Sequence, residues 1–170
     1  NSSPRDSGLG TGGGAGLSSA GQISAYEFGN SNLVAEGKSS SGIVLVAEDN
    51  PVMQELAIRQ IDRLGFAAEV VKNGRLAVEA VRSGRYVLVL MDCQMPEMDG
   101  YEATMTIRRE EKEDLASGKH VPIIAMTASA MKGDRENCIA SGMDDYLSKP
   151  VGQKELLRVL NKYVRKAESE

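Results

Sequence analysis

Four short apolar segments of the chain each end at side chains that can bind a metal ion or a phosphate group. Glu48 and Asp49 follow the first segment, Asp92 follows another, and Thr127 and Lys149 close two more. Three carboxylates without a Cys or His ligand pattern suit a hard cation that prefers oxygen, and Mg2+ is the strongest candidate. These residues therefore predict a metal–phosphate site, provided that the fold brings them together.

The five side chains have complementary roles in phosphoryl transfer. Asp49 and Asp92 are expected to bind the cation directly, and Glu48 is expected to act through water. A carboxylate beside a divalent cation can attack phosphorus and form an aspartyl phosphate. Lys149 is expected to neutralise charge on the transferred group, and Thr127 to hydrogen-bond one of its oxygens. Each residue alone has an ordinary explanation as a cap or turn residue, so the prediction rests on the set.

Short apolar runs that alternate with helical periods predict the elements that carry these residues. The run VLVLM is apolar on both faces, as expected of a central parallel strand. The alternation predicts a doubly wound α/β fold with a parallel sheet, and such folds bind ligands at the carboxyl ends of the strands. The expected strands are at 43–47, 67–71, 87–91, 123–126 and 144–148, and the expected helices are at 51–64, 74–82, 101–114, 132–140 and 153–166.

The first 42 residues differ in composition from the rest of the chain, because ten of them are Gly and ten are Ser. Such a stretch cannot bury enough apolar surface to offset its conformational entropy. We expect a flexible linker at 1–42, a folded domain at 43–166 and a tail at 167–170. A docking peptide around 23–34 is the alternative for the linker. The chain starts at Asn1 rather than Met, which suggests a fragment of a longer protein.

Composition excludes several classes of protein. The net charge is -4 and the pI is about 5.2, without a basic run, which argues against direct nucleic-acid binding. No apolar stretch approaches the roughly 20 residues of a spanning helix, so no direct membrane contact is expected. Cys93 and Cys138 form neither a CxxC nor a zinc pattern and are expected to be buried, reduced thiols in a cytoplasmic protein. The lone histidine, His120, is expected to be a loop residue.

Four motifs resemble those of the receiver domains of two-component response regulators. The similarity runs from about residue 41 to 165 and is most like the C-terminal receiver of a hybrid sensor histidine kinase. It implies a flavodoxin-like (βα)5 fold with the sheet order 2-1-3-4-5. The motifs are VLVAEDNPVMQ at 44–54, VLVLMDCQMPEMDG at 87–100, IIAMTASA at 123–130 and GMDDYLSKPV at 142–151.

The resemblance assigns roles around the metal. It implies that Asp92 is phosphorylated and that Mg2+ is bound by Asp49, Asp92 and the main-chain carbonyl of Gln94. Glu48 completes an acidic pair that is Glu-Asp here rather than the more usual Asp-Asp. This departure is not expected to affect metal binding.

The resemblance also assigns a switch. Lys149 matches the family lysine and is expected to precede a cis peptide bond to Pro150. Thr127 and Tyr146 match a pair in which the hydroxyl moves onto the phosphoryl group and the ring swings inward behind it. The switched surface would be built from the fourth helix, the fifth strand and the fifth helix.

The implied partner is a histidine kinase dimerisation domain or a histidine phosphotransfer protein, with no small-molecule substrate beyond phosphoryl donors. A free-standing regulator, an unphosphorylated docking module and a Mg2+-dependent phosphohydrolase with an aspartate nucleophile are the alternatives. Such hydrolases usually carry an acid two residues after the nucleophile, where this chain has Gln94. The sequence contains no kinase catalytic domain. Extra residues around 111–120 predict a longer third helix or loop.

Overall fold

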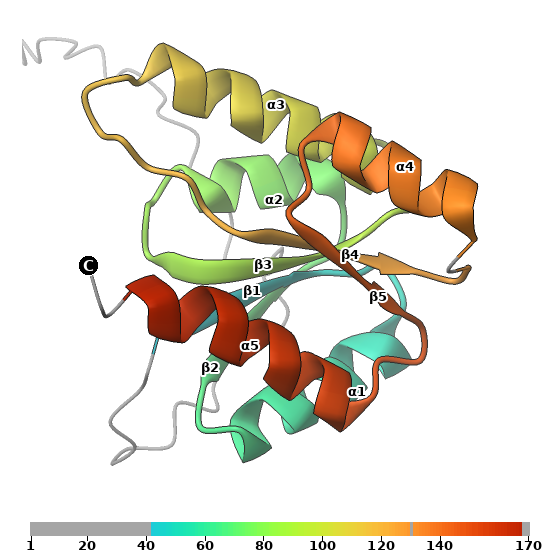
Figure 1. Cartoon of the computed structure of the whole chain (residues 1–170). Helices are drawn as coiled ribbons and strands as arrows, with labels where there is room; N and C mark the ends of the chain where they lie inside the picture. The colour runs from blue at the N-terminus through green and yellow to red at the C-terminus, as the bar shows by residue number, and fades with distance from the viewer. Residues whose placement is uncertain (1–41, 130, 168–170) are drawn as a thin grey trace, which may run out of the picture.

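The computed structural model describes residues 42–129 and 131–167. The linker and docking peptide predicted within 1–41, and the tail residues 168–170, lie outside the described residues. Strands and helices alternate along the described chain (Figure 1). The strands are β1 (Ile43–Ala47), β2 (Ala67–Val71), β3 (Tyr86–Asp92), β4 (Ile123–Thr127) and β5 (Asp145–Ser148). The helices are α1 (Pro51–Arg63), α2 (Gly74–Val81), α3 (Gly100–Glu113), α4 (Lys132–Ser141) and α5 (Gln153–Ala167).

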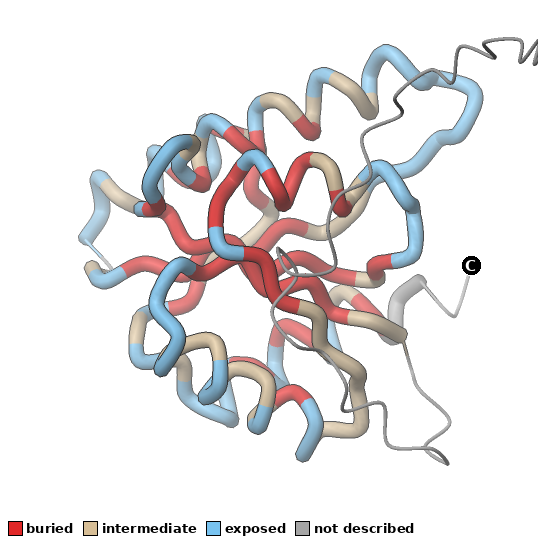
Figure 2. The backbone as a smooth tube through the Cα atoms, turned by 180° about the vertical axis from the view of Figure 1, so that it is seen from behind, coloured by how far each residue is buried: buried red, intermediate tan, exposed pale blue. Residues whose placement is uncertain are grey.

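The five strands form one parallel sheet in the order β2-β1-β3-β4-β5, which confirms the predicted fold class and strand order. Helices α2, α3 and α4 cover one face of the sheet, and α1 and α5 cover the other (Figure 1). The sheet is the most deeply buried part of the molecule, and the exposed positions lie mainly on the helices and connectors (Figure 2). This arrangement places the carboxyl ends of β1, β3, β4 and β5 along one edge.

The sheet divides the core into two clusters, one under each layer of helices. Val89 and Met91 of β3 belong to the cluster under α2, α3 and α4, whereas Leu88 and Leu90 belong to the cluster under α1 and α5. Side chains alternate between the faces of a strand, so a central strand with helices on both sides must be apolar throughout. This requirement explains the uninterrupted apolar run that precedes Asp92.

Local capping fixes the helix boundaries near the sheet edge. The Asn50 side chain accepts hydrogen bonds from the N–H groups of Val52 and Met53, at 2.9 and 3.4 Å, and starts α1 directly after the acidic pair. Asp99 caps α3 by accepting from the N–H of Glu102 at 2.8 Å. Every predicted boundary agrees with the structure to within one residue.

One boundary difference has a clear cause. Asp144 was expected to begin the fifth strand, but β5 begins at Asp145. The Asp144 carboxylate instead accepts hydrogen bonds from the N–H of Ile123 and from Arg108, both at 2.8 Å. These contacts hold the residue against the start of β4 and the side of α3.

The extra residues predicted around 111–120 divide between the last turn of α3 and an exposed connector that leads to β4. Arg108 anchors this region, and its side chain is only 11% exposed. It donates to Glu111 at 2.7 Å, to Asp144 at 2.8 Å and to the carbonyl of Gly142 at 2.9 Å. His120 lies in the connector, with Nε2 2.8 Å from Asp144 Oδ1. In residues 42–129 and 131–167, no helix has both the length and the apolarity needed to cross a membrane.

Candidate functional site

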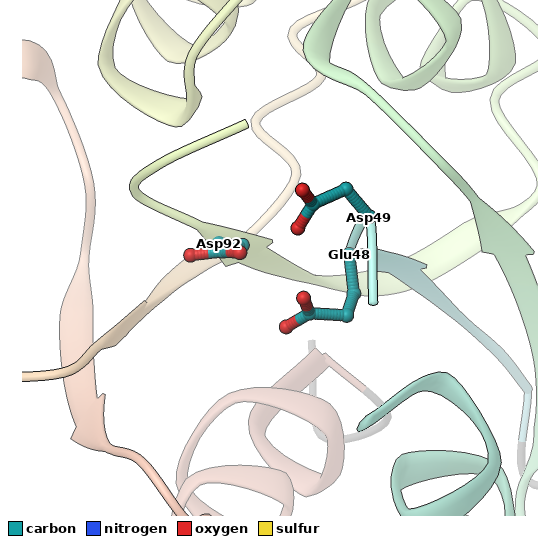
Figure 3. A group of neighbouring side chains, drawn as sticks. All are labelled: Glu48, Asp49 and Asp92. Atoms are coloured by element: carbon teal, nitrogen blue, oxygen red, sulfur yellow. The ribbon is translucent and has the colours of Figure 1, made fainter. Parts of the chain in front are cut away.

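Three carboxylates converge where β1 and β3 end side by side. Oxygens of Glu48, Asp49 and Asp92 all lie within 4.8 Å of one another. Figure 3 shows the three side chains together, two from the segment after β1 and one from the tip of β3. Glu48 and Asp92 are buried, at 2% and 5% exposure, whereas Asp49 is exposed. The parallel sheet thus brings together acids that are 43 residues apart in the chain.

Lys149 directly follows β5, which pairs with β4, and its side chain reaches back to this cluster. Its Nζ lies 2.7 Å from Glu48 Oε2 and 2.9 Å from Asp92 Oδ2. Its main-chain N–H donates to the Thr127 carbonyl at 2.7 Å, which holds the segment after β5 against the end of β4. The peptide bond from Lys149 to Pro150 is cis.

Burial and charge act in opposite directions on these groups. Burial raises the pKa of Glu48, and the nearby charge of Asp92 adds to this effect, although hydrogen bonds from Lys149 and the Asn50 N–H oppose it. Burial lowers the pKa of Lys149, but its hydrogen bonds to Glu48 and Asp92 outweigh that effect, so the net pKa is raised. Lys149 therefore remains a cation between two carboxylates.

The cluster fits a hard divalent cation. All three acidic side chains offer oxygen atoms, and the one ammonium group cannot balance three carboxylates. Oxygen-only sites of this kind suit Mg2+, which is held by one or two carboxylates together with substrate oxygens. The Gln94 N–H donates to Asp92 Oδ1 at 3.1 Å, so the backbone at Gln94 lies beside the Asp92 carboxylate.

Thr127 and Tyr146 lie on β4 and β5, but the structure does not join Thr127 to the acidic cluster by a hydrogen bond. The Thr127 hydroxyl donates to the Ser129 carbonyl at 2.8 Å and accepts from the Ser129 N–H at 3.2 Å. Tyr146 is half-buried, and the Arg135 guanidinium lies 5.5 Å from the centre of its ring. Both residues predicted to form the switch therefore hold contacts on the side of the site toward α4.

Gly100 supports the site and was not expected to do so, because Asp99-Gly100 reads simply as a turn. A Cβ at Gly100 would lie 2.1 Å from the main-chain oxygen of Asp92. The Gly100 N–H also donates to the Cys93 carbonyl at 3.1 Å. The start of α3 therefore packs directly on the backbone of Asp92, and only glycine fits there. The signal in the sequence was glycine immediately after a capping residue.

Gln54 is a second supporting residue that the sequence did not reveal. Its side-chain amide donates to the main-chain carbonyl of Glu48 at 2.6 Å, which ties the first turns of α1 back to the acidic pair. Cys93 and Cys138 are buried free thiols, as predicted. Burial raises the pKa of Cys93 to about 12, which keeps the thiol protonated beside Asp92.

Residues 44–161 match the model of the response regulator receiver domain, and the chain therefore belongs to that family. It is 41% identical over 155 residues to hybrid signal transduction histidine kinase I of Dictyostelium discoideum, covering 81% of this chain and 9% of the relative. It is 42% identical over 120 residues to the sensor protein GacS of Pseudomonas syringae pv. syringae, covering 71% and 13%. The chain thus spans only a small part of these relatives.

Solved structures agree with this assignment. The receiver domain of sensor histidine kinase PA1611 from Pseudomonas aeruginosa, which holds a magnesium ion in its active-site cleft, is 44% identical with a TM-score of 0.65. That match covers 73% of this chain and 98% of the other. The receiver domain of Ssk1 from Saccharomyces cerevisiae, crystallised with the phosphotransfer protein Ypd1, is 31% identical with a TM-score of 0.67, covering 72% and 88%.

Proposed function

We propose that Asp92 accepts a phosphoryl group from a phosphohistidine and thereby switches a protein-interaction surface. The observation that carries this proposal is the position of Lys149, whose ammonium contacts both Asp92 and Glu48 in a cluster with Asp49. Burying the carboxylates of Glu48 and Asp92 costs free energy that their attraction to Lys149 offsets only in part, so a contribution to stability is a poor explanation of the cluster. A receiver domain uses such a set to bind a cation and to stabilise the negative charge of an incoming phosphoryl group.

The reaction forms a bond between an Asp92 carboxylate oxygen and phosphorus while the bond from phosphorus to the imidazole nitrogen breaks. The imidazole leaves as a neutral group after it takes up a proton. Lys149 stabilises negative charge on the transferred oxygens, and the Gln94 N–H holds the acceptor carboxylate in place. Phosphoryl transfer has a loose transition state, so the domain contributes mainly position and charge.

Mg2+ is the proposed cofactor, held by Asp49, Asp92 and the main-chain carbonyl of Gln94, with Glu48 acting through water. When bound, the ion neutralises charge on the phosphoryl oxygens. The receiver domain of PA1611 carries magnesium at its active site, and the receiver domain of CKI1 from Arabidopsis thaliana was crystallised with Mg2+ and BeF3-. The oxygen-only donor set of this chain supports the same metal.

The proposed switch couples the site to the surface formed by α4, β5 and α5. Thr127 would leave its contacts with Ser129 to bind the phosphoryl group, and Tyr146 would follow it inward. A hollow of about 550 Å3 lies on this surface, and Tyr146 forms part of its wall with Arg135 from α4 and Arg158 from α5. A movement of Tyr146 would therefore change the shape of the hollow that a partner meets.

The proposed partner is a histidine kinase dimerisation domain or a histidine phosphotransfer protein. The relatives are hybrid histidine kinases, and the Ssk1 receiver was crystallised with the phosphotransfer protein Ypd1. We therefore propose that the chain is the receiver domain of a hybrid kinase and takes part in a phosphorelay. The domain would lie in a cytoplasmic segment of that kinase. The kinase activity would belong to other parts of such a protein.

Incubation with acetyl phosphate and Mg2+ tests the proposal. The intact mass should rise by one phosphoryl group in the wild type and in Asp99→Asn, which keeps a capping side chain on α3. Asp92→Asn should show no rise. A chain that gains no phosphoryl group with Mg2+ present is not a phospho-accepting receiver, and sustained hydrolysis of p-nitrophenyl phosphate would indicate a hydrolase.

A further inference from the structure

Gln60 links α1 to the segment that carries Lys149. Its side-chain Nε2 donates to the main-chain carbonyl of Val151 at 2.8 Å, across 91 residues of sequence. Val151 lies two residues after Lys149, whose own N–H is held by the Thr127 carbonyl at 2.7 Å. The segment is thus held to β4 before the proline and to α1 after it.

The Gln60 amide is held in an unfavourable setting. Its Oε1 is buried and has no hydrogen-bond partner within the described residues. Leaving a buried acceptor unpaired destabilises the folded state. Rotating the amide by half a turn would bring Oε1 against the Val151 carbonyl and lose the hydrogen bond, so the orientation is fixed by Val151.

Gln60 also shares a small cavity with the reactive groups. This cavity, about 20 Å3, is lined by Glu48, Lys149 and Val151 as well as Gln60. Lys149 has a flexible side chain that must keep its Nζ on Glu48 and Asp92, at 2.7 and 2.9 Å. A shift of the main chain at Val151 would therefore move the base of that side chain relative to its two partners.

We infer that Gln60 is a positioning residue for phosphoryl transfer, which acts by fixing the segment from which Lys149 reaches Asp92. The inference rests on the proposed role of Lys149. Among the described residues, the Gln60 amide donates to Val151 and not to Asp49, Asp92 or Gln94, so its loss should slow transfer without weakening metal binding. An error of about 1 Å in a catalytic group can lower a rate by about 100-fold, and loss of a supporting hydrogen bond commonly costs 10-fold or more.

The first test is Gln60→Met, which keeps the length of the side chain and removes the donor. Its phosphorylation by acetyl phosphate at saturating Mg2+ should be about 10-fold slower than in the wild type. Mg2+ affinity, measured by calorimetry, should stay within about 2-fold because the carboxylates are unchanged. Arg59→Met is the matched control, since Arg59 is exposed and pairs with Glu55 on the same helix. Its rate should equal that of the wild type.

A double-mutant cycle separates positioning from general destabilisation. In a Lys149→Met background, Gln60→Met should change the remaining rate by less than about 2-fold, because the group it positions is gone. An equal loss in both backgrounds would overturn the inference, as would a wild-type rate in Gln60→Met or a parallel loss of Mg2+ affinity.

Amide hydrogen exchange gives a readout that does not depend on phosphorylation. The Lys149 N–H should exchange faster in Gln60→Met than in Arg59→Met, because the segment has lost one of its two anchors. Equal exchange would overturn the inference even if the wild type accepted no phosphoryl group. Failure of the wild type to be phosphorylated would count against the proposed function alone.

Discussion

Glu48 and Asp49 are neighbours in the sequence but have opposite environments. Glu48 is 2% exposed, and Lys149 and the Asn50 N–H both bind its carboxylate. Asp49 is exposed. The buried acid therefore holds the ammonium group in place, whereas the exposed acid is free to bind a cation that enters from solvent. This difference in exposure is consistent with the separate roles expected of the two acids from the sequence.

Asp49→Ala should abolish Mg2+ binding and phosphorylation while the fold is retained. The free energy of unfolding should change by less than about 1 kcal/mol, because Asp49 is exposed and surface charges contribute little. Calorimetry with Mg2+ and intact mass after acetyl phosphate treatment measure the loss. Glu55→Ala on the exposed face of α1 is the control and should behave as the wild type. Normal labelling of Asp49→Ala would refute the ligand assignment.

Gly100→Ala should destabilise the protein by about 2 kcal/mol or more, because a Cβ 2.1 Å from the Asp92 oxygen forces the backbone apart. Gly133→Ala is the matched control, since a Cβ there meets no atom within 4 Å. In helix α4 that change should stabilise by up to about 1 kcal/mol. Urea unfolding measures both. Equal stability of the two variants would mean that α3 does not pack on Asp92 as described.

Among the elements, α3 is joined through Arg108 to the segments that lead into β4 and β5. Arg108→Met should cost about 2–4 kcal/mol, because it leaves the carboxylates of Glu111 and Asp144 without their buried partner. Arg82→Met removes a comparable pair with Glu110, but Arg82 is 58% exposed, so the cost should be below about 1 kcal/mol. Denaturant unfolding compares them. Equal costs would show that the Arg108 network contributes no more than a surface ion pair.

Tyr86, the first residue of strand β3, has a raised pKa. Burial and the hydrogen bond to Glu69 raise the pKa of Tyr86 from its ordinary 10.0 to about 12. The folded state therefore holds this proton more tightly, and the resulting stability is complete below pH 10 and lost as the pH rises toward 12. Tyr86→Phe lacks this dependence. The stability difference from the wild type should shrink by on the order of 1 kcal/mol between pH 9 and 11.5, measured by urea unfolding.

The sequence was sufficient to predict the elements, and it picked out Glu48, Asp49, Asp92 and Lys149, which the fold brings together, because both have local signals. Asn50 before a proline marks a helix start, and acids after apolar runs mark strand ends. The supporting contacts have no such signal. Gln60 reaches Val151 across 91 residues, and Arg108 of α3 reaches Asp144, in the connector before β5, across 36 residues. Only the folded chain shows which backbone oxygen lies opposite a polar side chain. The same holds for the tight contact at Gly100.

For the whole molecule, the predicted division into linker, domain and tail leads to a test by truncation. Removing residues 1–41 should leave the melting temperature within about 2 °C and the rate of phosphorylation by acetyl phosphate unchanged, because both cores lie in the described domain. Calorimetry and mass spectrometry check this. A large loss of stability would show that the segment packs on the domain, contrary to the linker prediction.

The contact between Gly100 and the Asp92 carbonyl also has a genetic consequence. Every single-base change in a glycine codon that alters the residue gives either a stop or an amino acid that carries a Cβ. Because no Cβ fits at Gly100, no one-step missense variant there can keep this packing. A single-base missense change at residue 100 should therefore always disturb this packing, whereas the exposed Gly133 has room for other side chains. A saturation library selected for stability should therefore be strongly enriched in glycine at 100 and accept many residues at 133.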